Sequence, residues 1–289
     1  IDEKGGLIDD IRIRDLLLAK PDDIISDIID GRFVALNVYD DQEHASQVFK
    51  MNNRTAIPVV DDNDVLLGIV TIDDILWVTN EEFSEDMQKM GGMEALNEPY
   101  LDISIFKLFK KRITWLVVLF IGELFTATAM GYFEDELAKV LVLASFIPLI
   151  LSTGGNSGSQ SSTLIIQAMA VGEITIADWW KILRREIIGG FLLGILLGIL
   201  GFFRVAVWHM IAPGFYGLHW FLIGITIGFT ILGVVILGTI TGSMLPIVLK
   251  RLGADPAVSS APFVATLVDV TAILIYFSLA YFFLQGTLL

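Results

Sequence analysis

Two carboxylates lie within long apolar stretches of this sequence. Asp269 occurs in ATLVDVTAILIYF, with no basic residue within a helical turn or two, and Glu123 occurs in LFIGELFTATAM. A carboxylate in such surroundings is protonated, faces water or faces a cation, because a bare charge in lipid is costly. For Asp269 the alternative is a polar contact to another helix, although Ser or Asn would make that contact at a lower desolvation cost. For Glu123 the sequence leaves a place in a cation pathway and a packing role equally open.

A polar, glycine-rich stretch interrupts another apolar segment. Residues 151–166 read LSTGGNSGSQSSTLII and follow the apolar run LVLASFIPLI. We expect Gly154, Gly155 and Gly158 to break the helix here, since non-helical backbone at membrane depth is tolerated where it is buried in protein or lines water. Asn156 would then satisfy freed backbone groups or offer an oxygen to a hydrated cation. The alternative is that the small residues serve only close helix packing.

The available metal ligands are oxygen atoms. The sequence has no cysteine and only three histidines, which are scattered along it. Carboxylate, amide and carbonyl oxygens suit hard cations such as Mg²⁺ or Ca²⁺. Because Mg²⁺ sheds water reluctantly, one or two carboxylates suffice to hold a hydrated ion, and Asp269 doubled by a second subunit would meet this need. No nucleophile–base spacing, phosphate-binding loop or dinucleotide-binding glycine pattern occurs, so we expect no enzyme.

Five apolar segments are long enough to span a membrane. Nine Lys and Arg residues flank them on one side, whereas only Lys139 and Arg204 lie on the other. This bias predicts that the amino terminus faces the cytoplasm and the carboxyl terminus faces out. A chain with five spans has no internal twofold axis, so we expect a pathway to lie on the axis of a homodimer. The predicted spans are 113–133, 138–171 (interrupted), 186–208, 220–249 and 258–284.

The first part of the chain has the opposite character. Residues 1–106 hold 24 Asp and Glu against 8 Lys and Arg, a net charge of −16, although the mean hydropathy of the whole chain is +0.70. The contrast predicts a soluble acidic domain joined to a membrane domain. The negative charge argues against a nucleic-acid partner and is compatible with bound cations.

An internal repeat organises the acidic half. DEKGGLIDDIRIRDLL aligns without gaps over DDNDVLLGIVTIDDIL at an offset of 59 residues. The second copy follows a strand-like FVALNVY, a helix-like QEHASQVFKMNN and a buried strand, AIPVV. This β-α-β-β-α order resembles a CBS domain. We therefore expect the remainder of a first CBS motif in residues 1–30 and a second motif in residues 31–80.

The resemblance to CBS domains implies a candidate nucleotide ligand. Many CBS pairs bind adenine nucleotides, which makes ATP a candidate here, and its ribose contacts would fall on Thr71 and Asp74. The alternative is that Asp74 only caps the helix that starts near Ile72.

Residues 81–112 join the two halves. EEFSEDMQKM predicts an acidic helix, GGM a break, and FKLFKKR places four positive charges directly before the first span.

Asp255 stands before Pro256 in LGADPA, where a helix cap is expected. It nevertheless lies at the cytoplasmic end of the span that carries Asp269, which also makes it a candidate for the pathway. Residues 113–289 complete the domain organisation as a five-helix membrane domain.

Three stretches of the sequence together resemble the MgtE family of bacterial magnesium channels or transporters. They are FIPLILSTGGNSGSQSSTLIIQAMAVGEI, ADPAVSSAPFVATLVDVTAILIYF and the CBS core with its acidic helix. The resemblance implies a homodimer in the plasma (inner) membrane, with five membrane helices per subunit, a cytosolic α/β CBS domain and a connecting plug helix within residues 88–106. Since the sequence begins in mid-pattern, we expect a longer protein with a further acidic domain before it.

The resemblance also assigns roles to individual residues. Asp269 would hold hydrated Mg²⁺ on the dimer axis, Ala265 would line the same site through its backbone carbonyl, and Asn156 lies in the matching polar segment of the second span. In this family, cytosolic Mg²⁺ closes the pore by binding acids of the CBS and plug region. The matching acids here are Asp41, Glu43, Asp74, Glu82, Glu85 and Asp86.

The predicted function is a Mg²⁺-selective channel that high internal Mg²⁺ shuts. Sixteen excess negative charges in the cytosolic part repel one another without metal, and divalent ions would remove that repulsion and move the plug helices. Asn53 and Trp77 stand where acids would be expected, and Ala261 where a pore-side Asn would be expected, which leaves the sensor's affinity open.

Other functions would use the same residues. The main alternative is a transporter or exchanger of Mg²⁺ and Co²⁺ that is coupled to Na⁺ or H⁺. In either case, Mn²⁺, Co²⁺ and Ni²⁺ are further candidates for the transported ion. An anion channel is disfavoured, because a carboxylate in the pathway repels anions.

Overall fold

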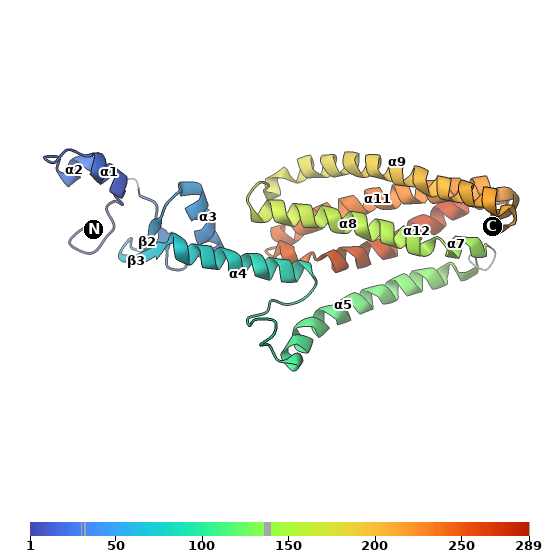
Figure 1. Ribbon diagram of the computed structural model, residues 1–289, viewed down its shortest axis with the longest axis horizontal. Coiled ribbons are helices and arrows are strands. Elements are labelled where there is room, and N and C mark those ends of the chain that lie inside the picture. The colour runs from blue at the N-terminus through green and yellow to red at the C-terminus, as the bar shows by residue number, and fades with distance from the viewer. Residues whose placement is uncertain (30, 32, 136–139, 289) are drawn as a thin grey trace. The chain divides into compact units, whose positions relative to one another are not determined.

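The computed structural model describes residues 1–29, 31, 33–135 and 140–288 (Figure 1). The chain forms two compact units, residues 1–84 and residues 85–289. Lys139, which entered the charge comparison above, lies outside the described residues, as do residue 30 and the start of the predicted span 138–171.

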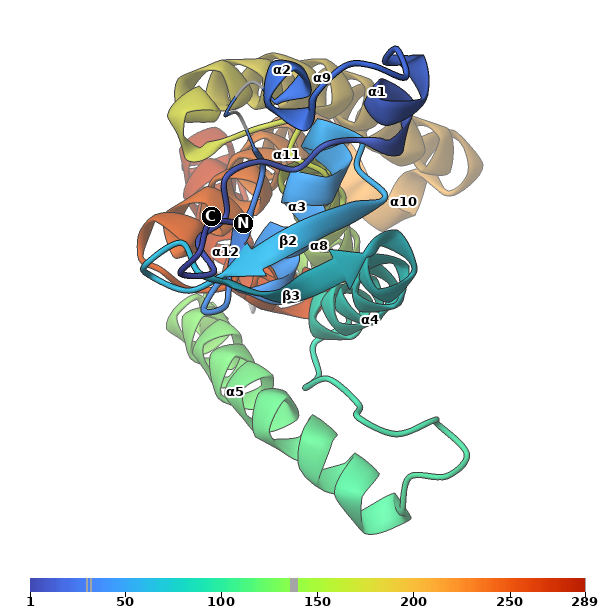
Figure 2. The same ribbon diagram turned by 90° about the vertical axis from the view of Figure 1, so that its left-hand side faces the viewer.

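The first unit is a small α/β domain built around a three-stranded sheet. Strand β2 is central and runs parallel to β1 and antiparallel to β3. Figure 2 shows β2 and β3 side by side. The buried side chains of Leu36, Phe49, Ile57 and Ile75 form its core. The elements are α1 (Ile13–Leu18), α2 (Ile25–Ile28), β1 (Leu36–Asn37), α3 (Gln42–Asn52), β2 (Ala56–Val60), β3 (Leu66–Thr71) and the first part of α4 (Ile72–Met90).

The predicted β-α-β-β-α order of the second repeat is confirmed, but its first strand is shorter than expected. FVALNVY contributes only the two residues of β1. The strand ends because the Asp40 carboxylate accepts the Asn37 N–H at 2.8 Å, and the Asn37 side chain accepts the Tyr39 N–H at 2.9 Å, which closes a turn. Among the described residues, the first repeat takes part in strand pairing only through a bridge between Gly6 and Val65.

Helix α4 unites two segments that the sequence analysis treated separately. It continues from β3 through EEFSEDMQKM, because residues 72–90 include no Gly or Pro to stop it. It ends at Gly91 and Gly92, where Gly92 has φ +75°. Residues 91–104 form turns and irregular backbone. The helix expected within residues 88–106 is therefore limited to the end of α4 and the first turn of α5 (Ile105–Tyr132).

Among the described residues, the second unit contains five helices long and apolar enough to cross a membrane, as predicted. α11 contacts α8, α9 and α12, whereas α5 contacts this group through α12. The elements after α5 are α7 (Leu141–Ala144), α8 (Ile147–Ala170), the 3₁₀ turn η1 (Ile176–Asp178), α9 (Trp179–Ile211), α10 (Pro213–Tyr216), η2 (Gly217–His219), α11 (Trp220–Arg251), η3 (Pro256–Val258) and α12 (Ala261–Leu284).

The core of the second unit lies where α8, α11 and α12 meet. Ile150, Val234 and Val268 are fully buried there. Tyr276 of α12 is also fully buried, and its hydroxyl donates to the Leu143 carbonyl at 2.9 Å. This hydrogen bond satisfies the buried phenol and joins α12 to α7.

The expected break in the second span is wrong: α8 runs through LSTGGNSGSQSSTLII as one helix. Its glycines serve close packing instead. A Cβ on Gly158 would lie 2.8 Å from the Val264 side chain, and a Cβ on Gly238 of α11 would lie 2.6 Å from the Gly154 carbonyl oxygen. The helix is retained because it satisfies its own backbone groups, which is the less costly arrangement inside a membrane.

A second glycine contact, which the sequence analysis missed, joins α9 to α11. A Cβ on Gly198 would lie 2.6 Å from the Gly228 carbonyl oxygen, and one on Gly194 would lie 3.1 Å from the Leu232 backbone. Gly190, Gly194 and Gly198 recur at intervals of four, so they share one face of α9. This spacing is the small-residue pattern typical of membrane helix pairs and was available in the sequence.

Substituting Gly238 tests the close contact between α8 and α11. Because the added methyl group of Gly238→Ala would meet backbone, the free energy of unfolding should fall by about 1–3 kcal/mol. In α9, Gly189 has nothing within 4 Å of an added Cβ, so Gly189→Ala should be neutral or stabilising by up to about 1 kcal/mol. Thermal unfolding of the purified protein, followed by tryptophan fluorescence, measures both. Equal effects of the two variants would contradict the packing described here.

Candidate functional site

Asp269 lies on α12, half-buried against α8. Its carboxylate has no hydrogen-bond or ion-pair partner among the described residues. The helix opposite approaches closely, because a Cβ on Gly155 would lie 3.2 Å from the Ala265 Cβ and 3.9 Å from Asp269 Oδ1. Any larger residue at 155 would therefore crowd the carboxylate. The structure thus brings Gly155 of the glycine-rich stretch next to Ala265 and Asp269, which the resemblance had assigned to one site.

The second intramembrane carboxylate lies near the first. Glu123 is exposed on α5 and directly follows Gly122. The two helices are in contact here, since a Cβ on Gly122 would overlap the Thr266 side chain. The sequence left the role of Glu123 open. Its position near Asp269 favours a role in a cation pathway over a role in helix packing alone. Two like charges at this depth attract a cation or a proton.

A row of polar side chains follows the exposed face of α8. Residues three, four, seven or eight apart share a helix face. Ser152 precedes Asn156 by four residues and Gln160 follows it by four, so the three side chains share one face of α8. The Asn156 Nδ2 donates to Ser152 Oγ at 3.3 Å. Exposed amides and hydroxyls on a membrane helix face water or another protein surface more favourably than lipid. This polar stripe consists of Ser152, Asn156, Gln160, Thr163 and Gln167.

Hydroxyl groups fasten α8 to the start of α12. Ser162 Oγ donates to the Ser259 carbonyl at 2.8 Å, and Ser159 Oγ donates to the Ala261 carbonyl at 3.1 Å. Ser260 caps α12 by accepting the Phe263 N–H. The helix that carries Asp269 therefore has a defined beginning, held by side chains of its neighbour.

Asp255 acts as the helix cap that the sequence predicted and also forms an ion pair. Its Oδ1 accepts the Ala257 N–H at 2.8 Å, and its Oδ2 accepts from Lys89 Nζ at 2.6 Å. The same ammonium lies 2.6 Å from Glu85. Burial alone would lower the pKa of Lys89, but hydrogen bonds to Asp255 and Glu85 outweigh it and raise that pKa above its usual range. Lys89 thus joins the end of α4 to the start of η3.

Further contacts hold the connecting segment against α5 and α12. Gly92 lies so close to Trp115 that a Cβ there would be 2.8 Å from the indole ring. Trp115 Nε1 donates to Ser260 Oγ at 3.1 Å. Gln88 accepts the Leu96 N–H at 2.6 Å through its side chain. The residues after α4 are therefore fixed to the same helix start as Asp255.

Metal binding by the predicted sensor acids stays a prediction. Among the described residues, no group of three or more His, Asp or Glu side chains could hold a metal ion. Asp41 and Glu43 flank Gln42, whose side chain donates to Glu82, so three of the acids lie in one neighbourhood at the start of α3. The other three are Asp74, on α4 in the first unit, and Glu85 and Asp86, on α4 in the second.

The predicted ribose contacts lie outside the cavity of the first unit. Thr71 Oγ1 donates to Asp74 Oδ2 at 3.0 Å. A cavity of about 480 Å³ is lined instead by residues of both repeats, including Arg12, Asp10 and Arg54. Arg54 pairs with Asp10 at 2.8 Å across that cavity. Nucleotide binding at Thr71 and Asp74 stays a prediction.

The fold and the site define a multi-pass membrane protein with a CBS domain and intramembrane carboxylates. The family model of the MgtE divalent cation transporters matches residues 147–279, and the CBS domain model matches residues 8–80. The chain belongs to the MgtE family.

Three curated relatives, each called magnesium transporter MgtE, align with 99% of this chain. They come from Thermus thermophilus, Enterococcus faecalis and Bacillus subtilis, at 36%, 33% and 30% identity. The alignments cover 61%, 60% and 61% of the relatives, so the chain spans about three fifths of their length.

Replacing Lys89 tests the attachment of α4 to the start of α12. Lys89→Met should speed amide hydrogen exchange in residues 85–96, with a cost of about 1 kcal/mol or less for a partly exposed pair. Because the pKa of Lys89 is raised, the ion pair stays intact below about pH 10.4. The ratio of exchange rates between Lys89→Met and the unaltered protein should therefore be constant between about pH 6 and 9, after correction for the intrinsic exchange rates of the amides. Lys110→Met, at an exposed position of α5, is the control. Unchanged exchange in Lys89→Met would show that the ion pair does not hold this segment.

Proposed function

We propose that this chain forms the conducting part of a homodimeric Mg²⁺ channel or transporter, in which hydrated Mg²⁺ passes Asp269 on the twofold axis and enters the cytoplasm. The observation that carries the proposal is an unpartnered carboxylate, Asp269, on a helix packed against α8, whose exposed face carries the polar stripe. The similarity to curated proteins called magnesium transporters supports the choice of ion.

A second copy of the chain would complete the pathway. The polar stripe is exposed on a single chain, where lipid would leave its amides unsatisfied. Pairing two copies through this face would enclose the polar groups and double the number of carboxylates. Because two like carboxylates on an axis repel each other, a cation between them would stabilise the pair. This geometry supports a homodimer with a pathway along its axis.

The site suits an ion that keeps its water. Ala265 precedes Asp269 by four residues, so its carbonyl oxygen accepts the Asp269 N–H within the helix and retains a second lone pair. Carbonyl, carboxylate and amide oxygens, the last from Asn156, would hydrogen-bond the water shell of Mg²⁺ without replacing it. The same ligands would admit Mn²⁺, Co²⁺ or Ni²⁺, with the radius of the opening deciding among them.

The proposed setting is a bacterial plasma membrane. The excess of Lys and Arg on one side of the spans supports an amino terminus in the cytoplasm and a carboxyl terminus outside. Arg184 and Arg185 of α9 and Lys250 and Arg251 of α11 lie at helix ends on the proposed cytoplasmic side.

Feedback closure would use the acids of the first unit and of α4. Because no three of these acids are grouped among the described residues, we expect a divalent ion to be held between the acids of two chains. Such binding would relieve the repulsion of an excess of 16 negative charges in residues 1–106. Through Lys89, Asp255 and Trp115, a movement of the end of α4 would reach the first turn of α12.

A coupled transporter is the second candidate, and the position of Glu123 favours it. A carboxylate beside Asp269 could bind H⁺ or Na⁺ while Asp269 holds the divalent ion. Current driven by a Mg²⁺ gradient alone, with Na⁺ and H⁺ at equilibrium, would support the channel. Transport that requires a Na⁺ or H⁺ gradient would support coupling.

Replacing Asp269 tests the pathway. Asp269→Ala should reduce Mg²⁺ flux in liposomes to the level of protein-free vesicles, since the charge that attracts the cation is lost, while the dimer still forms. Glu123→Gln should lower flux only in part. Glu173→Gln, at an exposed carboxylate after α8, should leave flux unchanged. Near-normal flux in Asp269→Ala would remove this residue from the pathway.

Varying Mg²⁺ on the side of the CBS domain tests feedback. Flux through the unaltered chain should fall as lumenal Mg²⁺ rises from micromolar to millimolar, in liposomes where this domain faces the lumen. Asp41→Ala and Glu82→Ala should shift the inhibition to higher Mg²⁺, whereas the neighbouring Glu81→Gln should not. Flux that is independent of lumenal Mg²⁺ would rule out closure by this part of the protein.

A further inference from the structure

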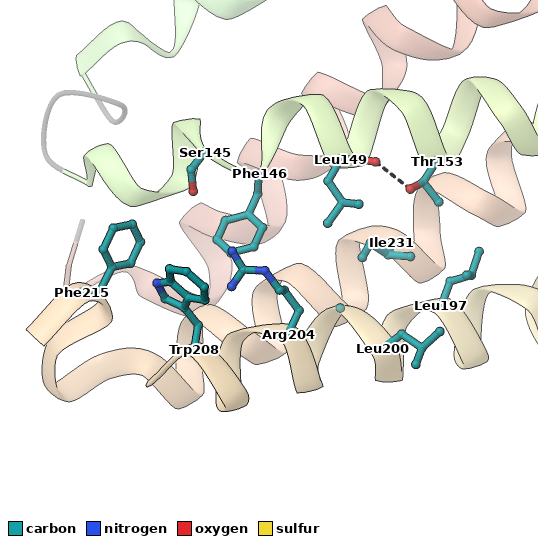
Figure 3. Close-up of a pocket in the computed structure, with 11 residues that line it drawn as sticks. Ser145, Phe146, Leu149, Thr153, Leu197, Leu200, Arg204, Trp208, Phe215 and Ile231 are labelled. Carbon is teal, nitrogen blue, oxygen red and sulfur yellow. Dashed lines mark hydrogen bonds between the residues drawn. The ribbon is translucent and has the colours of Figure 1, made fainter. Parts of the chain in front are cut away.

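A groove lies between α8 and α9 at the end of the second unit formed by α7 and α10 (Figure 3). Its volume is about 450 Å³, within the range of sites for small organic ligands. The walls are mainly apolar and include Phe146, Leu149, Leu197, Leu200 and Phe215. Neither Asp269 nor the polar stripe contributes to this lining, so the groove is distinct from the proposed ion site.

The hydroxyl groups in the lining are already satisfied. Thr153 Oγ1 donates to the Leu149 carbonyl at 2.6 Å, and Ser145 Oγ donates to the Val142 carbonyl at 2.7 Å (Figure 3 shows the first). Both bonds stay within the local helical backbone. A ligand of the groove would therefore meet hydrocarbon walls rather than a ring of hydrogen-bond donors.

Arg204 places one charge in this groove. Its guanidinium lies 4.6 Å from the centre of the Trp208 ring, and Nη1 donates to the Tyr216 hydroxyl at 3.3 Å. In the part of the chain that the structure describes, no carboxylate pairs with it. Arginine has five N–H donors, so most of them remain available. A planar guanidinium with free donors matches the oxygens of a phosphate group.

Arg204 lies at the level of a membrane interface. It follows Arg185 on α9 by 19 residues, which corresponds to about 30 Å along a helix and equals the thickness of the hydrocarbon core. Trp208, Tyr216 and Trp220 surround the same helix end. Tyr and Trp are enriched where a helix leaves the hydrocarbon. Arg204 is thus placed at the headgroup level of the leaflet opposite Arg185.

We propose that the groove binds one anionic glycerophospholipid, with the phosphate on Arg204 and an acyl chain between α8 and α9. From Arg204 the groove extends toward Leu197, seven residues or about 10 Å along α9, in the direction that a lipid tail takes from its headgroup. The Arg204 guanidinium would bind the phosphate, and the apolar walls of the groove disfavour a ligand that has no hydrocarbon part. An anionic headgroup is favoured over a zwitterionic one, because the described lining offers no carboxylate for a headgroup amine. This site does not depend on the ion that the protein carries.

Native mass spectrometry of the delipidated protein, titrated with dioleoylphosphatidylglycerol, tests the proposal. The unaltered chain should retain one lipid per subunit and prefer it to dioleoylphosphatidylcholine. Arg204→Gln should weaken phosphatidylglycerol binding by about tenfold, the loss expected for charge-assisted hydrogen bonds. The lipid should also raise the melting temperature of the unaltered chain but not that of Arg204→Gln.

Filling the groove separates this site from general attraction to anionic lipid. Leu200→Trp leaves Arg204 in place and should abolish the bound lipid by occupying its tail site. Leu196→Trp, at an exposed position of the same helix outside the lining, should leave lipid binding unchanged. Equal lipid binding by the unaltered chain and Arg204→Gln would overturn the proposal. So would a loss of the dimer, rather than of lipid, in Leu200→Trp, because the groove would then hold a second copy of the chain.

Discussion

The contact of α8 with α11 and α12 at backbone distance is the constraint on which the membrane unit depends. Side chains cannot separate helices that meet at Gly154, Gly158 and Gly238, so the three helix axes are held close together. Lipid offers no hydrophobic drive for helix association, and such close packing supplies van der Waals contact in its place. Gly155 belongs to the same stretch, and its missing side chain leaves room for Asp269. Packing and site therefore rest on one run of small residues.

The same run explains why a polar sequence can span a membrane. Its backbone is satisfied by the helix, and Ser159 and Ser162 donate to the start of α12. The remaining amides and hydroxyls gather on the other face as the polar stripe. A single chain has no described partner for that face. In the proposed homodimer, the stripe, Asp269 and Glu123 would form one half of a site, and the second copy would bring like charges together where a hydrated cation would bind.

The start of α12 is attached to the connecting segment by side-chain contacts. Lys89 bridges two carboxylates, one on its own helix and one at Asp255, and Trp115 bonds the cap of α12. These contacts provide a physical route from α4 to the helix that carries Asp269. At the opposite end of the membrane unit, Arg204 and its aromatic neighbours form a surface suited to a lipid headgroup. Control by cytosolic ions and anchoring by lipid would therefore act on opposite ends of one helix bundle.

The sequence by itself determined the two halves, the five spans, the second CBS motif, the cap at Asp255 and the isolation of Asp269 in an apolar segment. These follow from local composition, spacing and propensity, which the chain carries without its fold. The tertiary structure decided that α8 is continuous, because glycines that could break a helix can equally allow a neighbour to approach. It also decided that Glu123 lies beside Asp269 and that Lys89 pairs with Asp255, 166 residues away. Such pairings arise from how helices pack, and no local pattern encodes them.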